Sequence, residues 1–324
     1  MKNNLLITCI ASALALAIST RAEEGGSAHY MPGANASFID AFPAKPGGIA
    51  VLDFFTYYKG SALGDRQLPL GGLLTSGIDA TVYANTVAAI YQTPWNVLGG
   101  GLAMGVAVPY VWVEVSGEAQ RISRRGQPGE RFSARDTANG IGDITVYPFM
   151  LGWTNVAPDL KLDLRLGIYA PTGEYEQGQL ANVGKNYWSF EPGFMASWLS
   201  SKIGTEVSLY TGIDFNTENP ETDYTSGTSL HMDLTVAQHL PLLGGFAGLG
   251  ANAFYYQQLT GDSGSGAQLG DFKGMTCGIG PVISYIRPLG GDVTLLAEVK
   301  WLPELSTAKR LEGDYIWMKV GILF

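Results

Sequence analysis

The chain has little cysteine and no long hydrophobic run after its first residues. Two of its 324 residues are cysteines, and Cys9 lies in the apolar N-terminal segment, so Cys277 is the single thiol of the remaining chain. A lone cysteine cannot form an internal disulfide bond. No later stretch has the roughly 20 consecutive apolar residues that a transmembrane helix needs. The sequence therefore excludes a disulfide framework and helical membrane insertion.

Basic side chains are also scarce. The sequence contains 20 Lys and Arg residues against 29 Asp and Glu residues, and its formal net charge is −9. Proteins that bind nucleic acids need clustered basic side chains to neutralise phosphates, so we predict no nucleic-acid partner. The sequence has three histidines, so few residues could serve as the base of a Ser/His/Asp catalytic triad. The carboxylates of the polar loops match no calcium-loop template. We therefore predict that the protein is not an enzyme and has neither a cofactor nor a metal site.

Glycine and aromatic residues, in contrast, are abundant. The sequence has 43 Gly, 16 Tyr and 7 Trp residues, and many short runs in which apolar and polar residues alternate. The clearest run is DLKLDLRLGIY, at residues 159–169, where leucines alternate with Lys161, Asp163 and Arg165. Successive side chains of a strand point to opposite faces, so this run has one apolar and one polar face. The composition and the alternation indicate an all-β protein.

The alternating runs are separated by connections of two kinds. Long polar loops alternate with short turns along the whole chain, and bacterial outer-membrane barrels have short periplasmic turns, longer outer loops and an even number of strands. We therefore predict an antiparallel transmembrane β-barrel over residues 48–324. The twelve predicted strands are residues 48–59, 78–91, 97–115, a strand from about 141, 160–169, 187–199, 206–215, 230–238, 246–258, 274–286, 293–301 and 315–324.

A soluble β-sandwich would show the same alternation. The two ends of the chain help to distinguish it from a membrane barrel. The sequence ends in YIWMKVGILF, an alternating strand that closes on Phe324. A C-terminal phenylalanine of this kind resembles the signal that the barrel-assembly machinery of Gram-negative bacteria recognises. Residues 1–22 have an early lysine, an apolar run and a small-x-small triplet, which predicts a secretory signal peptide cleaved after Ala22. Both ends favour a barrel in contact with outer-membrane lipid and lipopolysaccharide.

Residues 23–47 precede the first predicted strand and mix proline, glycine and aromatic residues. Two interpretations are open for this segment. It is either a flexible periplasmic tail or a plug that enters the barrel from the periplasmic side. Its aromatic residues Tyr30, Phe38 and Phe42 favour docking, because disordered tails are poor in aromatic side chains.

Several motifs together resemble one bacterial family. They are GIGDITVYPF at 140–149, YAPTGEY at 169–175, NVGKNYWSFEPGF at 182–194 and DFNTENPETDYTSGTSLHMD at 214–233. The chain is similar over residues 30–324 to the proteins of the MetA pathway of phenol degradation, which are outer-membrane barrels described as transporters. The resemblance implies an uptake channel for small aromatic or other hydrophobic solutes, linked to their catabolism. It implies no catalytic residues.

The predicted strands place charged residues on the lumen side. A barrel of twelve strands lies between the filled eight-stranded barrels and the water-filled sixteen-stranded porins, so these charges either line a selective channel or fill it. We favour a narrow, partly plugged channel. The candidate lumen residues are Lys161, Asp163, Arg165, Glu206, Asp214, His231, Asp233, Glu298, Lys300 and Lys319.

The outer loops supply a second set of candidates. These residues either contact a ligand at the outer rim or hold their own loops in shape through side-chain to backbone bonds. They also define the alternative function, a structural or adhesive barrel that binds ligands through its loops and has no conducting pore. The candidate loop residues are Tyr175, Asn216, Asn219, Asp223, Tyr224 and Asp262.

Overall fold

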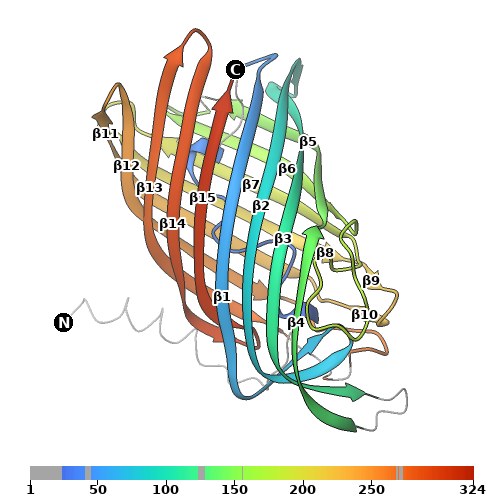
Figure 1. Cartoon of the computed structure of the whole chain (residues 1–324). Coiled ribbons are helices and arrows are strands. Elements are labelled where there is room, and N and C mark those ends of the chain that lie inside the picture. The colour runs from blue at the N-terminus through green and yellow to red at the C-terminus, as the bar shows by residue number, and fades with distance from the viewer. Residues whose placement is uncertain (1–23, 41–44, 123–127, 155, 268, 270–272) are drawn as a thin grey trace, which may run out of the picture.

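The structure is a computed structural model that describes residues 24–40, 45–122, 128–154, 156–267, 269 and 273–324. The predicted signal peptide lies outside the described residues. Figure 1 shows strands that wrap around a central axis, with the C-terminus at the end that carries the short turns. No helix within the described ranges is long and apolar enough to cross a membrane.

The strands form one closed antiparallel sheet. Its members are β1 (Ile49–Leu70), β2 (Leu73–Val97), β3 (Gly100–Ile122), β4 (Pro128–Ile141), β5 (Ile144–Thr154), β6 (Leu160–Ala170), β7 (Ser189–Leu199), β8 (Thr205–Asn216), β11 (Ser229–Leu242), β12 (Gly245–Gln258), β13 (Met275–Gly290), β14 (Val293–Ala308) and β15 (Glu312–Leu323). Two short strands, β9 (Glu218–Asn219) and β10 (Tyr224–Thr225), pair with each other in an outer loop.

The barrel has twelve strand positions, because β4 and β5 share one. β4 pairs with the outer half of β3, and β5 pairs with its inner half. The first and last strands complete the circle, since Ala50 of β1 lies opposite Leu323 of β15. Phe324 continues this seam through two backbone hydrogen bonds with Ile49, of 2.7 and 2.9 Å. The prediction of an antiparallel barrel of about twelve strands is confirmed.

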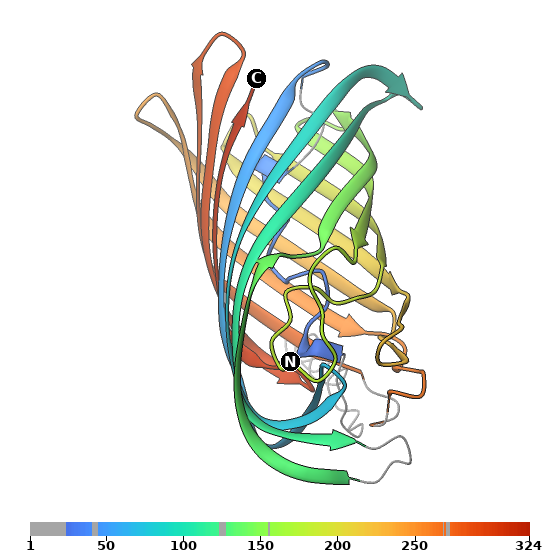
Figure 2. The same cartoon turned by 45° about the vertical axis from the view of Figure 1, so that its right-hand side comes forward.

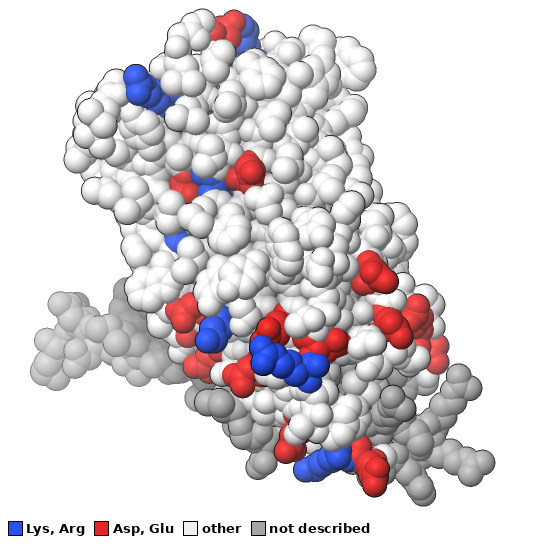
Figure 3. Space-filling model, viewed as in Figure 1, with Lys and Arg blue, Asp and Glu red and all other residues white. Residues whose placement is uncertain are grey.

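The alternation along the strands sorts side chains between two environments. In β11, His231 and Asp233 are buried in the barrel, whereas Met232, Leu234 and Val236 are exposed on its outside. Large exposed hydrophobic side chains recur on the outer face of every long strand. Figure 3 shows that most charged side chains of the viewed face gather near the long-loop end. The outer wall therefore has the apolar band of a barrel that spans a membrane.

Three connections differ from their predicted positions. The predicted loops at 60–77 and 116–138 are largely strand, so the β1–β2 and β3–β4 ladders reach beyond the apolar band. Both faces of these extensions are partly polar, and a polar strand lacks the alternation that identifies a membrane strand. The turn predicted at residues 92–96 lies instead at Leu98 and Gly99, which have the positive φ angles of a two-residue hairpin turn.

A charge on the outer wall should destabilise the barrel. We expect Val236→Arg to lower the free energy of unfolding in phospholipid vesicles by about 2–4 kcal/mol, because an arginine would face lipid near the bilayer midplane. The matched control is Leu243→Arg in the turn after β11, for which we expect about 0–1 kcal/mol. Urea titrations followed by tryptophan fluorescence would measure both values. Equal costs at the two positions would contradict the membrane assignment of this wall.

Candidate functional site in the barrel lumen

The N-terminal segment, residues 24–40, runs through the lumen. It begins with the single-turn helix η1 (Glu24–Gly26) among the outer loops and ends with η2 (Phe38–Asp40) near the short-turn end. Figures 1 and 2 show this segment as a blue trace enclosed by the strands. Lys45 then forms an ion pair with Asp292 in the turn between β13 and β14. The segment therefore crosses the lumen from the outer loops to the inner turns before β1 begins.

Asp233 of β11 holds the middle of the segment. Its carboxylate accepts hydrogen bonds from the Tyr30 hydroxyl, from the Gly33 backbone N at 3.1 Å and from the Asn35 backbone N at 3.4 Å. Three strands further round the sheet, Lys300 Nζ of β14 donates to the carbonyl oxygens of Gly33 and Asn35 at 3.1 and 3.0 Å. An acid and a base of the lumen wall thus satisfy the backbone groups that an irregular buried segment leaves open.

The inner end of the segment is anchored by three charged residues of the wall. The Phe38 backbone N donates to Glu206 Oε1 at 2.7 Å. Lys319 forms an ion pair with the Asp40 side chain, and Arg165 Nη2 donates to the Asp40 carbonyl oxygen at 3.1 Å. All of these charged side chains are buried, so each bond also compensates a charge that water does not reach.

The outer half of the segment is anchored around His29. Its Nδ1 lies 2.7 Å from the Ser189 hydroxyl, and its Nε2 lies 2.9 Å from Asp143 Oδ2. Asp143 sits in the break between β4 and β5, where the chain leaves the ladder and turns a carboxylate into the lumen. Lys185 Nζ donates to the Ser27 carbonyl oxygen at 2.5 Å. The break between β4 and β5 therefore places Asp143 where it contacts the segment.

The structure places nine of the ten candidate lumen residues in buried positions inside the barrel, and Lys161 is half-buried. Five of them, Arg165, Glu206, Asp233, Lys300 and Lys319, form hydrogen bonds or ion pairs with the N-terminal segment. A sixth, His231, stacks on its Tyr30 ring. Asp163 bonds within the wall, to Arg165 at 2.8 Å.

Sequence reasoning missed the partners that lie on the segment. Asp40 pairs with Lys319 and His29 contacts Asp143, although neither residue belongs to an alternating run. The one available signal was the set of aromatic residues before the first strand. Tyr30, for example, is 3% exposed and stacks on His231.

The part of the lumen wall formed by β1 and β2 is mainly apolar. Inward positions of β1 and β2 carry small or apolar residues such as Leu52, Ala84 and Ala88. Between this wall and the segment lies a cavity of about 440 Å³, which Tyr147 and Met150 of β5 also line. The cavity is therefore apolar on the side of β1 and β2, and on its other side it is bounded by the segment and by polar wall residues such as Asp143 and Arg165.

A hydrophobic cluster lies at the outer mouth. The ladder between β1 and β2 shifts register between Ala62 and Gln67, and such irregularities bend a strand pair. Figure 2 shows the hairpin bending across the long-loop end of the barrel. Leu68 and Leu73 of this hairpin are buried in one cluster with Leu180 and Leu311 of neighbouring loops.

The candidate loop residues bond mainly to one another and to the segment. Asn216 Nδ2 donates to the carbonyl oxygens of residues 226 and 227, the Tyr224 hydroxyl donates to Asp262, and Asp223 accepts a bond from Ser265. Tyr175 and Asn219 donate to opposite oxygens of Glu24, each at 3.2 Å. These contacts favour the interpretation in which the residues hold their own loops in shape. A role in binding a ligand stays a prediction.

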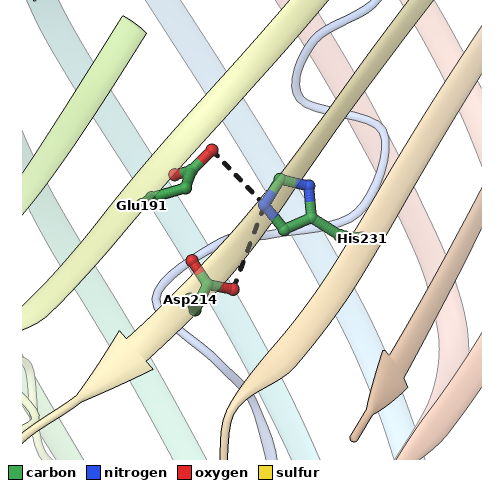
Figure 4. Close-up of side chains that lie close together, drawn as sticks. All are labelled: Glu191, Asp214 and His231. Carbon is green, nitrogen blue, oxygen red and sulfur yellow. Dashed lines mark ion pairs between the residues drawn. The ribbon is translucent and has the colours of Figure 1, made fainter.

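One group of side chains has the composition of a metal site. Glu191, Asp214 and His231 are buried on the lumen wall, and one potential ligand atom from each lies within 4.8 Å of the others (Figure 4). The sequence interpretation predicted no metal site, since the loop carboxylates match no calcium-loop template. It did not consider these three residues together, because they lie on separate strands and share no motif.

The closed antiparallel sheet, with its apolar outer wall and polar lumen, has the architecture of an outer-membrane β-barrel. The chain belongs to the family described as "Putative MetA-pathway of phenol degradation", which matches residues 64–320. The resemblance predicted from the motifs is thereby confirmed. No curated protein sequence matches the chain.

Solved structures share the barrel at low sequence identity. An outer membrane channel from Pseudomonas putida F1 is 13% identical, with a TM-score of 0.60, over 91% of this chain and 100% of the channel. The β domain of the Bordetella autotransporter BrkA is 12% identical, with a TM-score of 0.47, over 86% of this chain and 99% of that domain. The likeness to the channel shows a common fold. That the protein is not an enzyme stays a prediction.

Removal of the central anchor should loosen the segment. Hydrogen bonds to charged groups contribute about 1.5–3 kcal/mol, so Asp233→Asn should speed amide exchange at Gly33 and Asn35 roughly tenfold to hundredfold. The matched control is Glu304→Gln, because Glu304 accepts its hydrogen bonds from barrel residues. Hydrogen exchange followed by mass spectrometry would compare the variants. Unchanged protection of the segment in Asp233→Asn would show that this anchor does not hold it.

The start of the segment should respond to pH. Burial raises the pKa of the Glu24 carboxyl, and the hydrogen bonds from Asn219 and Tyr175 only partly oppose this. Because the docked state binds the proton more tightly, protonation of this carboxyl stabilises docking. The stabilisation is complete at pH values below the ordinary pKa of the carboxyl, about 4.5. This contribution is lost as pH rises through the raised pKa.

We therefore expect exchange protection of residues 24–28 to decrease from pH 4.5 to pH 7, after correction for intrinsic exchange rates. Glu24→Gln should remove this decrease and keep the protection high at pH 7. A decrease of the same size in the variant would assign it to another group.

Proposed function

We propose that this protein is an outer-membrane channel for small aromatic or hydrophobic solutes, and that residues 24–40 keep its lumen closed at rest. The proposal includes cleavage of the signal peptide after Ala22, insertion by the barrel-assembly machinery and a location in the outer membrane of a Gram-negative bacterium. The observation that carries it is the apolar cavity of about 440 Å³ between the segment and the wall of β1 and β2. Cavities of this size with mostly apolar walls suit small organic ligands.

The apolar side of the cavity supports the choice of solute. The charged wall is occupied by the segment, so a passing solute would meet mainly the apolar side. Small inward residues such as Ala80, Ala84 and Ala88 leave space along β2 without offering hydrogen bonds. An ion or a sugar would lose its hydration there without compensation. An aromatic solute with few polar groups would lose much less hydration free energy on entering this space.

Passage requires a change at both the outer mouth and the segment. The hydrophobic cluster around Leu68 and Leu311 lies at the outer end, and the segment occupies the axis. The segment is held by hydrogen bonds and ion pairs to a separate wall, so it could leave without unfolding the strands. A resting channel that conducts poorly is the expected consequence.

Electrical recording would test whether a pore exists. In planar bilayers, we expect the full mature chain to show little conductance and a variant lacking residues 23–47 to show large, stable steps. Asp233→Asn should give an intermediate open fraction, because it removes one anchor. Retention of the heat-modifiable folded form on gels would verify each barrel. If the deletion variant folds but shows no conductance, and the outer loops bind a ligand, the results would favour the structural or adhesive barrel.

The apolar wall can be tested by two adjacent substitutions. Ala88 faces the cavity and is 6% exposed, whereas the next residue, Ala89, faces outward. We expect Ala88→Phe to lower the uptake of labelled phenol by cells that lack the native gene, because the ring fills part of the cavity. Ala89→Phe should leave uptake unchanged, since it adds an apolar group to an apolar surface. Equal uptake in the two variants would place the solute path elsewhere.

A further inference from the structure

Three neighbouring strands bring two carboxylates to one imidazole. Glu191 lies on β7, Asp214 on β8 and His231 on β11, and these strands are adjacent in the sheet. His231 Nε2 is 3.3 Å from Glu191 Oε1 and 3.9 Å from Asp214 Oδ2. Figure 4 shows the imidazole directed between the two carboxylates. All three side chains are 1% exposed, so the group is isolated from water.

The surroundings hold the two carboxylates in place. Tyr169 and Tyr210 each donate a hydroxyl hydrogen bond to a different oxygen of Glu191. Ser229 Oγ donates to Asp214 Oδ2 at 2.9 Å. Each carboxylate oxygen can accept more than one bond, so these contacts fix the orientation and still leave lone pairs available. Outer contacts of this kind orient the ligands of protein metal sites.

The imidazole of His231 makes no hydrogen bond of its own. Neither Nδ1 nor Nε2 makes a contact with hydrogen-bond geometry, although the residue is completely buried. Nε2 meets the two carboxylates only through ion-pair contacts of 3.3 and 3.9 Å. Buried polar atoms in proteins are nearly always satisfied, and an exception calls for a missing partner such as an ion. Nε2 is the nitrogen that faces Glu191 and Asp214. A missing partner at this atom would therefore lie between the carboxylates.

A glycine provides the space for this arrangement. Gly212 of β8 lies directly opposite His231 in the ladder. A Cβ atom at this position would stand 2.5 Å from His231 Nε2 and 2.9 Å from Glu191 Oε1. Any other residue would push the imidazole away from the carboxylates. The close approach of the three side chains therefore depends on Gly212.

We propose that Glu191, Asp214 and His231 bind a divalent transition-metal ion of the Zn²⁺ class. Imidazole nitrogen and carboxylate oxygen are common ligands of Zn²⁺, and three protein ligands leave a position for water. A divalent cation brings two positive charges to two carboxylates, whereas a protonated imidazole brings one. Imidazole as a ligand also favours transition metals over Ca²⁺ and Mg²⁺.

The site would couple the wall to the N-terminal segment. The Tyr30 ring of the segment stacks on the His231 ring, with 3.5 Å between centroids and 11° between planes. A metal bound to Nε2 would fix the ring on which Tyr30 rests. This inference does not depend on the proposed function, because a metal in the wall requires neither a conducting pore nor a particular solute.

Metal analysis of the full mature chain would test the proposal. The protein is refolded in detergent with Zn²⁺, or in parallel with Co²⁺, and dialysed against metal-free buffer before mass spectrometry. We expect about one metal ion per folded chain, as for a defined structural site. The Co²⁺ form should show the visible absorption of a four- or five-coordinate site. Absence of bound metal after refolding with either ion would overturn the proposal and leave an ion pair of His231 with its carboxylates.

The control comes from a second buried histidine of the same wall. His239 Nε2 lies 2.6 Å from Glu206 Oε2, and this pair belongs to no cluster of three potential ligands among the described residues. His231→Gln and Asp214→Asn should reduce bound metal to background, and His239→Gln should retain it. Heat-modifiability on gels confirms that each variant is folded. Equal metal content in His231→Gln and His239→Gln would show that binding occurs elsewhere.

Discussion

The structure depends on the compensation of charges that are buried in the lumen. A barrel of this size has room for side chains and one extra segment, and little for bulk water. Acids and bases of the wall such as Asp233, Lys300 and Lys319 need partners, because an unpaired buried charge is costly. Residues 24–40 supply these partners with backbone groups and with Asp40. The charged wall and the irregular segment thus satisfy each other, and a wall without the segment would need water as the partner of its charges.

This mutual dependence explains the asymmetry of the lumen. The segment lies where its hydrogen bonds are, against the charged strands, and leaves the alanine-rich face of β2 uncovered. A segment held by hydrophobic packing would have covered that face instead. One side of the barrel therefore binds the segment, and the other side, formed by β1 and β2, leaves an apolar path.

Much of the fold was predictable from the sequence because lipid imposes a simple rule on the strands. Alternation around Asp163 and Arg165 identified the inward face, and the loop asymmetry identified the barrel. The strand extensions of β1 and β2 were missed, because both of their faces lie outside the apolar band. The candidate site was predictable only in part. The alternation along its strand predicts that His231 points into the lumen. Its approach to Glu191, however, depends on how the neighbouring strands are staggered.

The contacts of the segment also could not be predicted, since they join distant parts of the chain. Tyr30 meets Asp233 across 203 positions, and no local pattern connects the two. The aromatic composition of residues 23–47 indicated that the segment docks, without indicating where. Its course from the outer loops to the inner turns is set by bonds that exist only when the wall is complete.

The path of the segment has a consequence for the order of folding. Lys319, on the last strand, pairs with Asp40, on the segment that precedes the first, so 279 positions separate the two residues. Contacts of this separation form late, because the entropy of closing so large a loop must be overcome first. The seam between β15 and β1 closes around a segment whose start already points toward the long loops. A segment left outside at that moment would have to be threaded through the finished barrel, so correct assembly requires its capture before closure.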